Sequence, residues 1–102
     1  MLTSVEIDES ARLLADPLRA RIVTLLAHES LCTCHLVNET GAHQSTVSHH
    51  LRVLREAGWV RTEPQGRFTY YQLLPDALEA LVGHLSALVA SAKGTRDRRR
   101  PC

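Results

Sequence analysis

The sequence predicts a mainly α-helical domain that carries one small β-hairpin. Apolar residues recur at helical spacing through most of the chain, the spacing changes to two residues after Trp59, and helical spacing returns after Pro75. At 102 residues, the chain is long enough for one domain with a single modest core. Residues 1–93 are expected to form this domain, and residues 94–102 are expected to be a disordered basic tail.

The composition excludes several broad classes of protein. The hydrophobic fraction of 44% excludes wholesale disorder. No apolar run approaches the roughly 20 residues of a membrane-spanning helix. The amino terminus has no basic region followed by an apolar segment, so no secretory signal is expected. Three cysteines are an odd number, which favours reduced thiols in the cytoplasm over a disulfide framework.

The net charge is only +1, but the charges are unevenly distributed. Residues 1–16 carry a net charge of −3, whereas residues 42–73 carry four arginines against two glutamates. Residues 93–102 add a net charge of +4. A DNA-binding face needs such a local positive potential, not a large overall charge.

Two helices are predicted in the first part of the chain. Residues 4–14 have apolar side chains at helical spacing. Asp16 and Pro17 then form a helix start, because aspartate can cap free N–H groups and proline at the first position loses no hydrogen bond. The second helix should stop within residues 28–30, and its arginines should lie mostly outside. Its expected buried stripe is Leu18, Ile22, Leu25 and Leu26.

A helix-turn-helix is predicted next: a short helix around residues 34–39, a turn at Gly41 and a longer helix from Gln44. The packed side of the longer helix is Val47, Leu51 and Leu54. Its opposite side is Ser45, Ser48, His49 and Arg52. These hydrogen-bonding groups and this cation suit the base edges and phosphates of a DNA major groove. Taken alone, the segment also fits a solvated amphipathic helix.

Two short strands, residues 60–63 and 67–73, are predicted around a turn of Pro64, Gln65 and Gly66. A hairpin that follows a recognition helix is a wing, so the predicted architecture is a winged helix-turn-helix. Arg67 lies beside the turn and could reach a phosphate or the minor groove, although a hairpin arginine is about as often simply solvated.

The last helix begins after Pro75 with a capping-box pattern formed by Asp76 and Glu79. An apolar stripe of about four turns follows, which is more than the domain needs to cover its own core. We expect the surplus to pair with a second copy of the chain and so to form a dimer. The alternative is that the helix folds back onto its own core. The stripe comprises Leu78, Leu81, Val82, Leu85, Leu88, Val89 and Ala92.

One cluster of possible metal ligands stands out, at residues 32–35. In the middle of a helix, Cys32 and Cys34 would point about 200° apart, but at a helix entrance their sulfur atoms can converge. Free N–H groups at that end favour thiolates. Thiolates select As(III), Sb(III), Cd(II), Zn(II) or Cu(I). Possible third donors are His35, His28, an acid from a partner's first helix, and Cys102.

The same cysteines have a simpler interpretation, because cysteine is often just a small buried residue. Sequence signals for catalysis are missing: there is no glycine-rich phosphate loop, no G-x-S-x-G and no H-E-x-x-H. An enzyme is therefore not expected, and no catalytic residue or catalytic cofactor is assigned.

These residues together resemble the ArsR/SmtB family of metal-sensing winged-helix repressors. The resembling segments are residues 15–22, 31–34, 44–60, 66–67 and 70–71. The resemblance implies a homodimer held by the first and last helices, which binds a palindromic operator and is released when an ion binds. It also implies that operator bases are read by Gln44, Ser45, Thr46, Ser48 and His49.

The resemblance further implies that Cys32 and Cys34 match the thiolates of the family's arsenic, cadmium and lead sensors. The chain departs from these patterns where arsenic sensors often have a third cysteine, because it has Val37 there. It also lacks the amino-terminal cysteines of cadmium and lead sensors. Of the acid and paired histidines that zinc and nickel sensors carry on the last helix, only Asp76 and His84 remain.

The resulting prediction is a dimeric cytoplasmic repressor that contacts DNA additionally through Arg52 and Arg67 and responds to a thiophilic ion. One alternative is a winged-helix regulator that responds to Ni(II) or Zn(II) through histidines and acids, or that senses no ion. Another is a metal-binding or protein-interaction module that never touches DNA.

Overall fold

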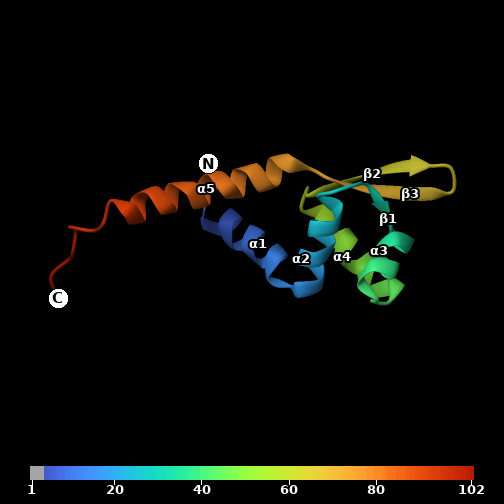
Figure 1. The fold of residues 1–102 in the computed structure, drawn as a ribbon, viewed down its shortest axis with the longest axis horizontal. Coiled ribbons are helices and arrows are strands. Elements are labelled where there is room, and N and C mark those ends of the chain that lie inside the picture. The colour runs from blue at the N-terminus through green and yellow to red at the C-terminus, as the bar shows by residue number, and fades with distance from the viewer. Residues whose placement is uncertain (1–3) are drawn as a thin grey trace.

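The computed structural model describes residues 4–102, with side chains described from Glu9 onward (Figure 1). The elements within this range are α1 (Ser4–Ala15), α2 (Pro17–Leu26), β1 (Leu31–Cys32), α3 (Thr33–Thr40), α4 (Gln44–Glu56), β2 (Val60–Gln65), β3 (Phe68–Leu73) and α5 (Pro75–Lys93). The predicted mainly helical winged helix-turn-helix is confirmed.

Local capping sets the start of α2 and the end of α3. Asp16 caps α2 by accepting a hydrogen bond from the backbone N–H of Arg19 at 3.0 Å. Gly41 ends α3 in the left-handed conformation, with φ of 72°. The end of α2 was predicted too late: the helix stops at Leu26, because residues 27–30 are needed to turn the chain into β1.

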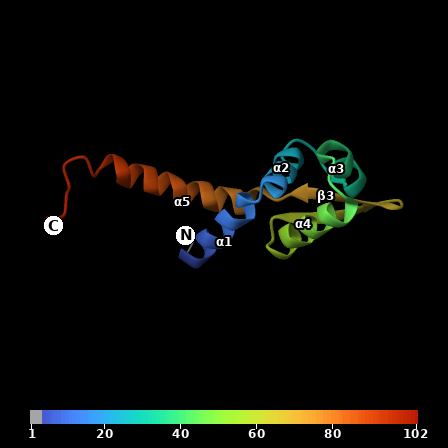
Figure 2. The same ribbon diagram turned by 90° about the horizontal axis from the view of Figure 1, so that it is seen from below.

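The core lies where α2, α3 and α4 meet, and among the described side chains Leu13 of α1 and Leu81 of α5 are also buried in it. Figure 2 shows these three helices gathered at the root of the β2–β3 hairpin, away from the free end of α5. The side chains with the least exposure are Ile22, Leu36, Val47, Leu51 and Leu54. Three of these five belong to α4, so the predicted packed side of that helix is confirmed.

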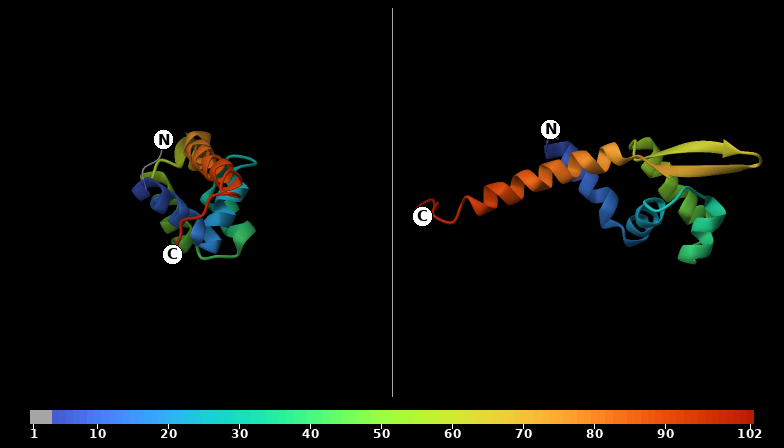
Figure 3. Two further views of the ribbon diagram at one scale, coloured as in Figure 1. Left: turned by 90° about the vertical axis from the view of Figure 1, so that its left-hand side faces the viewer. Right: turned by 45° about the horizontal axis from the view of Figure 1, so that its top comes forward.

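The sheet is antiparallel, with strand order β1-β3-β2. The predicted hairpin is confirmed, but its turn is shorter than expected because Pro64 and Gln65 belong to β2. Proline is tolerated there since β2 is an edge strand, whose outer N–H groups need no partner. The hairpin extends beyond the helices as a wing (Figure 3). The two-residue strand β1 was not predicted.

Helix α5 runs away from the core and makes the molecule elongated, with extents of 62 × 23 × 22 Å. The capping box predicted for Asp76 is wrong: Leu74 is the N-cap, no side chain caps the helix, and Pro75 occupies its first turn. Most of the predicted apolar stripe stays exposed in the single chain. The exposed fractions are Val82 58%, Leu85 47%, Leu88 52% and Val89 54%. Among the helices described, none is long and apolar enough to cross a membrane.

Candidate DNA-binding face and metal centre

The two sides of α4 differ as the sequence predicts. Val47, Leu51 and Leu54 are fully buried and attach the helix to the core. Every candidate base-reading or phosphate-binding residue of α4 is exposed: Gln44, Ser45, Thr46, Ser48, His49 and Arg52. The guanidinium of Arg52 lies 3.3 Å from Nδ1 of His49, so this cation sits within the polar face. The buried side of α4 therefore fixes the helix to the core, and its polar side is left accessible.

The wing adds a second exposed surface. Arg67 lies in the two-residue turn between β2 and β3 and is exposed. Phe68, which follows it, is 56% exposed. At the base of the hairpin, Arg61 donates a hydrogen bond from Nε to Gln72 at 2.6 Å, which ties that arginine across the two strands. Among the described residues, the exposed Arg67 is therefore the cation at the wing tip, whereas the guanidinium of Arg61 is hydrogen-bonded to Gln72.

His50 connects the recognition helix to the start of α2. The side chain is 7% exposed, and its Nδ1 accepts a hydrogen bond from Nε of Arg19 at 3.2 Å. Its Nε2 lies 3.8 Å from the Asp16 carboxylate. Because Nδ1 is an acceptor, the neutral ring carries its proton on Nε2, facing the carboxylate. The arrangement ties α4 to the N-terminus of α2.

The environment favours the neutral form of this histidine. Burial lowers the pKa of His50 below its ordinary value of 6.5, the nearby Asp16 opposes this effect, and the Arg19 cation adds to it. The pKa of Asp16 is also lowered, chiefly by the backbone N–H of Arg19 that it accepts as the N-cap. Both groups therefore disfavour protonation in the folded protein.

Acidification should destabilise the fold through His50. The unfolded chain binds the proton near pH 6.5, whereas the folded chain resists it. The free energy of unfolding should therefore fall as pH drops through 6.5, until the folded-state pKa is passed. Urea unfolding between pH 8 and 5 should show a fall in the free energy of unfolding that His50→Gln removes. His28→Gln, which removes an exposed histidine that is not among the groups shifting the His50 pKa, should keep the loss; equal pH profiles for the two variants would refute this assignment.

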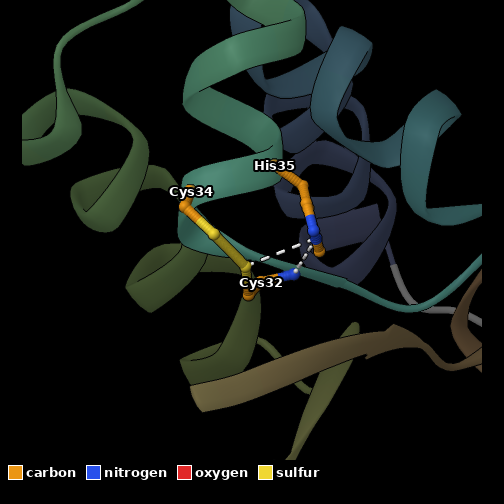
Figure 4. Close-up of side chains that lie close together, drawn as sticks. All are labelled: Cys32, Cys34 and His35. Carbon is orange, nitrogen blue, oxygen red and sulfur yellow. Dashed lines mark hydrogen bonds between the residues drawn. A yellow bond between two sulfur atoms is a disulfide. The ribbon is translucent and has the colours of Figure 1, made fainter. Parts of the chain in front are cut away.

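The candidate metal ligands meet at the entrance to α3. The donor atoms of Cys32, Cys34 and His35 all lie within 4.8 Å of one another, and no other group of three or more such donors occurs among the described residues. Cys32 is the N-cap of α3 and is 4% exposed, while Cys34 and His35 are exposed in its first turn. Figure 4 shows the side chains of Cys34 and His35 directed toward Cys32. The predicted convergence of the two sulfur atoms is confirmed.

The redox state differs from the expectation of reduced thiols, because the structure joins Cys32 and Cys34 in a disulfide. The bond is possible because Cys32 is the extended N-cap of α3, so its side chain is not held about 200° around the helix from that of Cys34. The two Cα atoms are 5.4 Å apart, within the range of disulfides. A disulfide has no thiolate to offer a metal ion, so the arrangement can serve as a metal centre only after reduction.

The other candidate third donors do not join the cluster. His28 lines a neighbouring cavity of about 300 Å³, which is bounded on one side by His35. Cys102 is an exposed free cysteine at the end of the chain, and Figure 1 places this terminus at the opposite end of the molecule from α3. Within one chain, His35 is therefore the donor that accompanies the two sulfur atoms.

Two contacts near these sites had no sequence signal. His50 and Arg19 are 31 residues apart, so no helical spacing relates them. Cys32 pairs with Tyr70 through β1, and a two-residue strand is too short to leave an alternating pattern. The tyrosines of residues 70–71 were noted only as part of the family resemblance.

Comparison with known proteins finds relatives among bacterial transcriptional regulators. Residues 16–62 match the family model described as "Bacterial regulatory protein, arsR family". An arsenical resistance operon repressor of Staphylococcus xylosus is 32% identical over 89 residues, which cover 87% of this chain and 86% of the relative. A cadmium resistance transcriptional regulatory protein of Listeria innocua is 39% identical over 61 residues, which cover 59% of this chain. The match spans only 51% of that longer relative.

A solved structure shows that the likeness extends to the fold. The crystal structure of a possible transcriptional regulator for arsenical resistance superposes with a TM-score of 0.70 at 36% sequence identity. The match covers 78% of this chain and 83% of that chain.

Proposed function

This chain belongs to the ArsR family of bacterial transcriptional regulators, and from that premise we propose that it is a homodimeric repressor released from operator DNA by a thiophilic ion. One observation carries the proposal. The cluster of Cys32, Cys34 and His35 forms the entrance of α3, the helix that packs directly against the recognition helix α4. A change in the donor cluster therefore acts on the element that holds the DNA-reading helix.

The exposed side of α4 supports DNA binding. Its hydroxyl and amide groups are suited to the edges of bases, and its cation is suited to phosphate. The residues assigned to operator contact are Gln44, Ser45, Thr46, Ser48, His49 and Arg52, with Arg67 from the wing. Burial of the opposite side of α4 means that these groups can be presented without distorting the core.

The exposed apolar face of α5 supports a homodimer. Leu85, Leu88 and Val89 lie on a helix that projects beyond its own core, and each is about half exposed. Large apolar patches of this kind mark interfaces in soluble proteins. A two-fold dimer would present two α4 helices to successive major grooves, so we expect a palindromic operator with half-sites about 34 Å or a multiple apart.

The donor set supports a soft or borderline ion. Reduced Cys32 and Cys34 would supply two thiolates and His35 one imidazole, a combination suited to Cd(II) or Zn(II) and, through its sulfurs, to As(III) or Sb(III). Two relatives are named for arsenical and cadmium resistance, which agrees with this range. Ni(II) bound through histidines and carboxylates fits less well, because the cluster formed by the described residues contains no carboxylate. When bound, the ion would supply a link between the N-cap residue Cys32 and the first turn of α3.

Replacing both thiols should abolish the ion response. The test uses protein reduced with a phosphine and a labelled palindromic duplex selected from a random pool, with arsenite, Cd(II), Zn(II) and Ni(II) titrated separately. At least one ion should weaken binding by about 5- to 150-fold in the parent. Cys32→Ser with Cys34→Ser should reduce the change to less than about twofold, since no thiolate remains.

Cys102→Ser is the matched control, because it removes the remaining cysteine and should respond like the parent. If the double serine variant still releases DNA on ion addition, the sensing site lies elsewhere. If no selected duplex binds more tightly than an unrelated one at any salt concentration, the proposed operator binding itself fails.

A further inference from the structure

Cys32 takes part in two structural elements besides the donor cluster. It is the N-cap of α3, and it is also the second residue of β1, where it pairs with Tyr70 of β3. Strand β3 pairs along its whole length with β2 to form the wing. One residue thus joins the candidate ion site, the helix-turn-helix and the wing.

His35 strengthens this connection. Its Nδ1 accepts a hydrogen bond from the backbone N–H of Cys32 at 3.2 Å, so this nitrogen holds the end of β1 in place. Its ring centroid lies 6.0 Å from that of Tyr70, with the two planes tilted by 52°. The imidazole therefore touches both the backbone of β1 and the side chain opposite it in the wing.

Nδ1 of His35 cannot accept this hydrogen bond and coordinate an ion at the same time. Nδ1 of a neutral histidine has one lone pair, which here accepts the Cys32 N–H. Coordination through Nδ1 would use that lone pair and would leave the N–H at the β1 end without its partner. Because β1 has only two residues and lies at the edge of the sheet, it has few other bonds to hold its register against β3.

We propose that ion binding at Cys32, Cys34 and His35 is transmitted to the wing through the Cys32–Tyr70 pairing, so that the wing is a second output beside α3 and α4. This inference rests on the proposed function and adds a route to it. Loss of the Cys32–His35 hydrogen bond loosens β1 against β3 and frees the hairpin to change its angle to α4. The operator then loses the Arg67 contact as well as contacts to α4.

Hydrogen exchange without DNA tests the structural part of the proposal. Cd(II) added to reduced protein should make the peptide containing Tyr70 exchange about threefold faster, because local opening of β3 becomes easier. The peptide spanning residues 78–88 of α5 is the internal control and should not change. Cys32→Ser with Cys34→Ser should remove the effect. An ion that binds the parent but leaves exchange in β3 unchanged would overturn the proposal.

Operator affinity tests the functional part through a thermodynamic cycle. If the wing is an output, Arg67→Ala should weaken ion-free binding and reduce the ion-induced loss of affinity by about threefold relative to the parent. Arg61→Ala is the matched control, because this wing arginine is already held by Gln72, and its ion response should equal that of the parent. If the ion weakens DNA binding by Arg67→Ala as much as it weakens DNA binding by the parent, the wing route is refuted and the proposed sensing function is not. A parent that binds DNA but shows no ion response would instead refute the proposed sensing function.

Discussion

Replacing Leu85 with aspartate should make the protein monomeric and lower its affinity for a palindromic duplex by about 100-fold or more, since one recognition helix would act alone. Leu85 is 47% exposed in the single chain, so its replacement should cost the monomer little stability. In a dimer, the carboxylate would be buried against apolar side chains, where an unpaired charge is strongly unfavourable. Sedimentation equilibrium and fluorescence anisotropy would measure the two effects.

Ala87→Asp provides the matched control for this experiment. Ala87 is exposed and lies two residues further along α5, about 200° around the helix from Leu85. It adds the same charge to the same helix on the side away from the apolar face, so it should remain dimeric and bind the duplex. If both variants stay dimeric, the face of α5 around Leu85 is not the dimer interface.

Combining Gln44→Ala with Ser48→Ala should remove most of the preference for the selected duplex over an unrelated one. Both residues are exposed on α4, so the fold should be unaffected. Each good contact to a base edge contributes about 1–3 kcal/mol of discrimination, and a dimer makes each contact twice. The preference should therefore fall by about 100-fold or more, while salt-dependent binding to any duplex remains because the arginines are unchanged.

Glu56→Gln is the control for this double variant, because Glu56 is exposed at the far end of the same helix. It should retain the full preference in competition assays at fixed salt concentration. A double alanine variant that still distinguishes the two duplexes as the parent does would contradict base reading by these residues, even if its overall affinity fell.

The faces of α4 were predictable because they depend on spacing alone. Val47, Leu51 and Leu54 recur at helical intervals, and burial of one side exposes the other. The start of α2 at Asp16 and the end of α3 at Gly41 were predictable for a similar reason, since a cap acts within one turn of the helix. The hairpin followed from the change of period, although its turn was placed too early because Pro64 was assigned to the turn.

The convergence of Cys32 and Cys34 was also predictable, because helix geometry forbids it in mid-helix and allows it at an entrance. Choosing His35 over His28 and Cys102 required the structure. All three residues have suitable donor atoms, and only the path of the chain decides which one lies near the sulfur atoms.

By itself, the sequence determined the five helices, the hairpin, the caps at Asp16 and Gly41 and the polar face of α4, because these depend on residues within a turn or two of one another. Only the tertiary structure decided that His50 accepts from Arg19 and that Cys32 pairs with Tyr70. These contacts join segments more than 30 residues apart. They arise when packing of the whole core brings separate elements together, and periodicity within a single element carries no record of that packing.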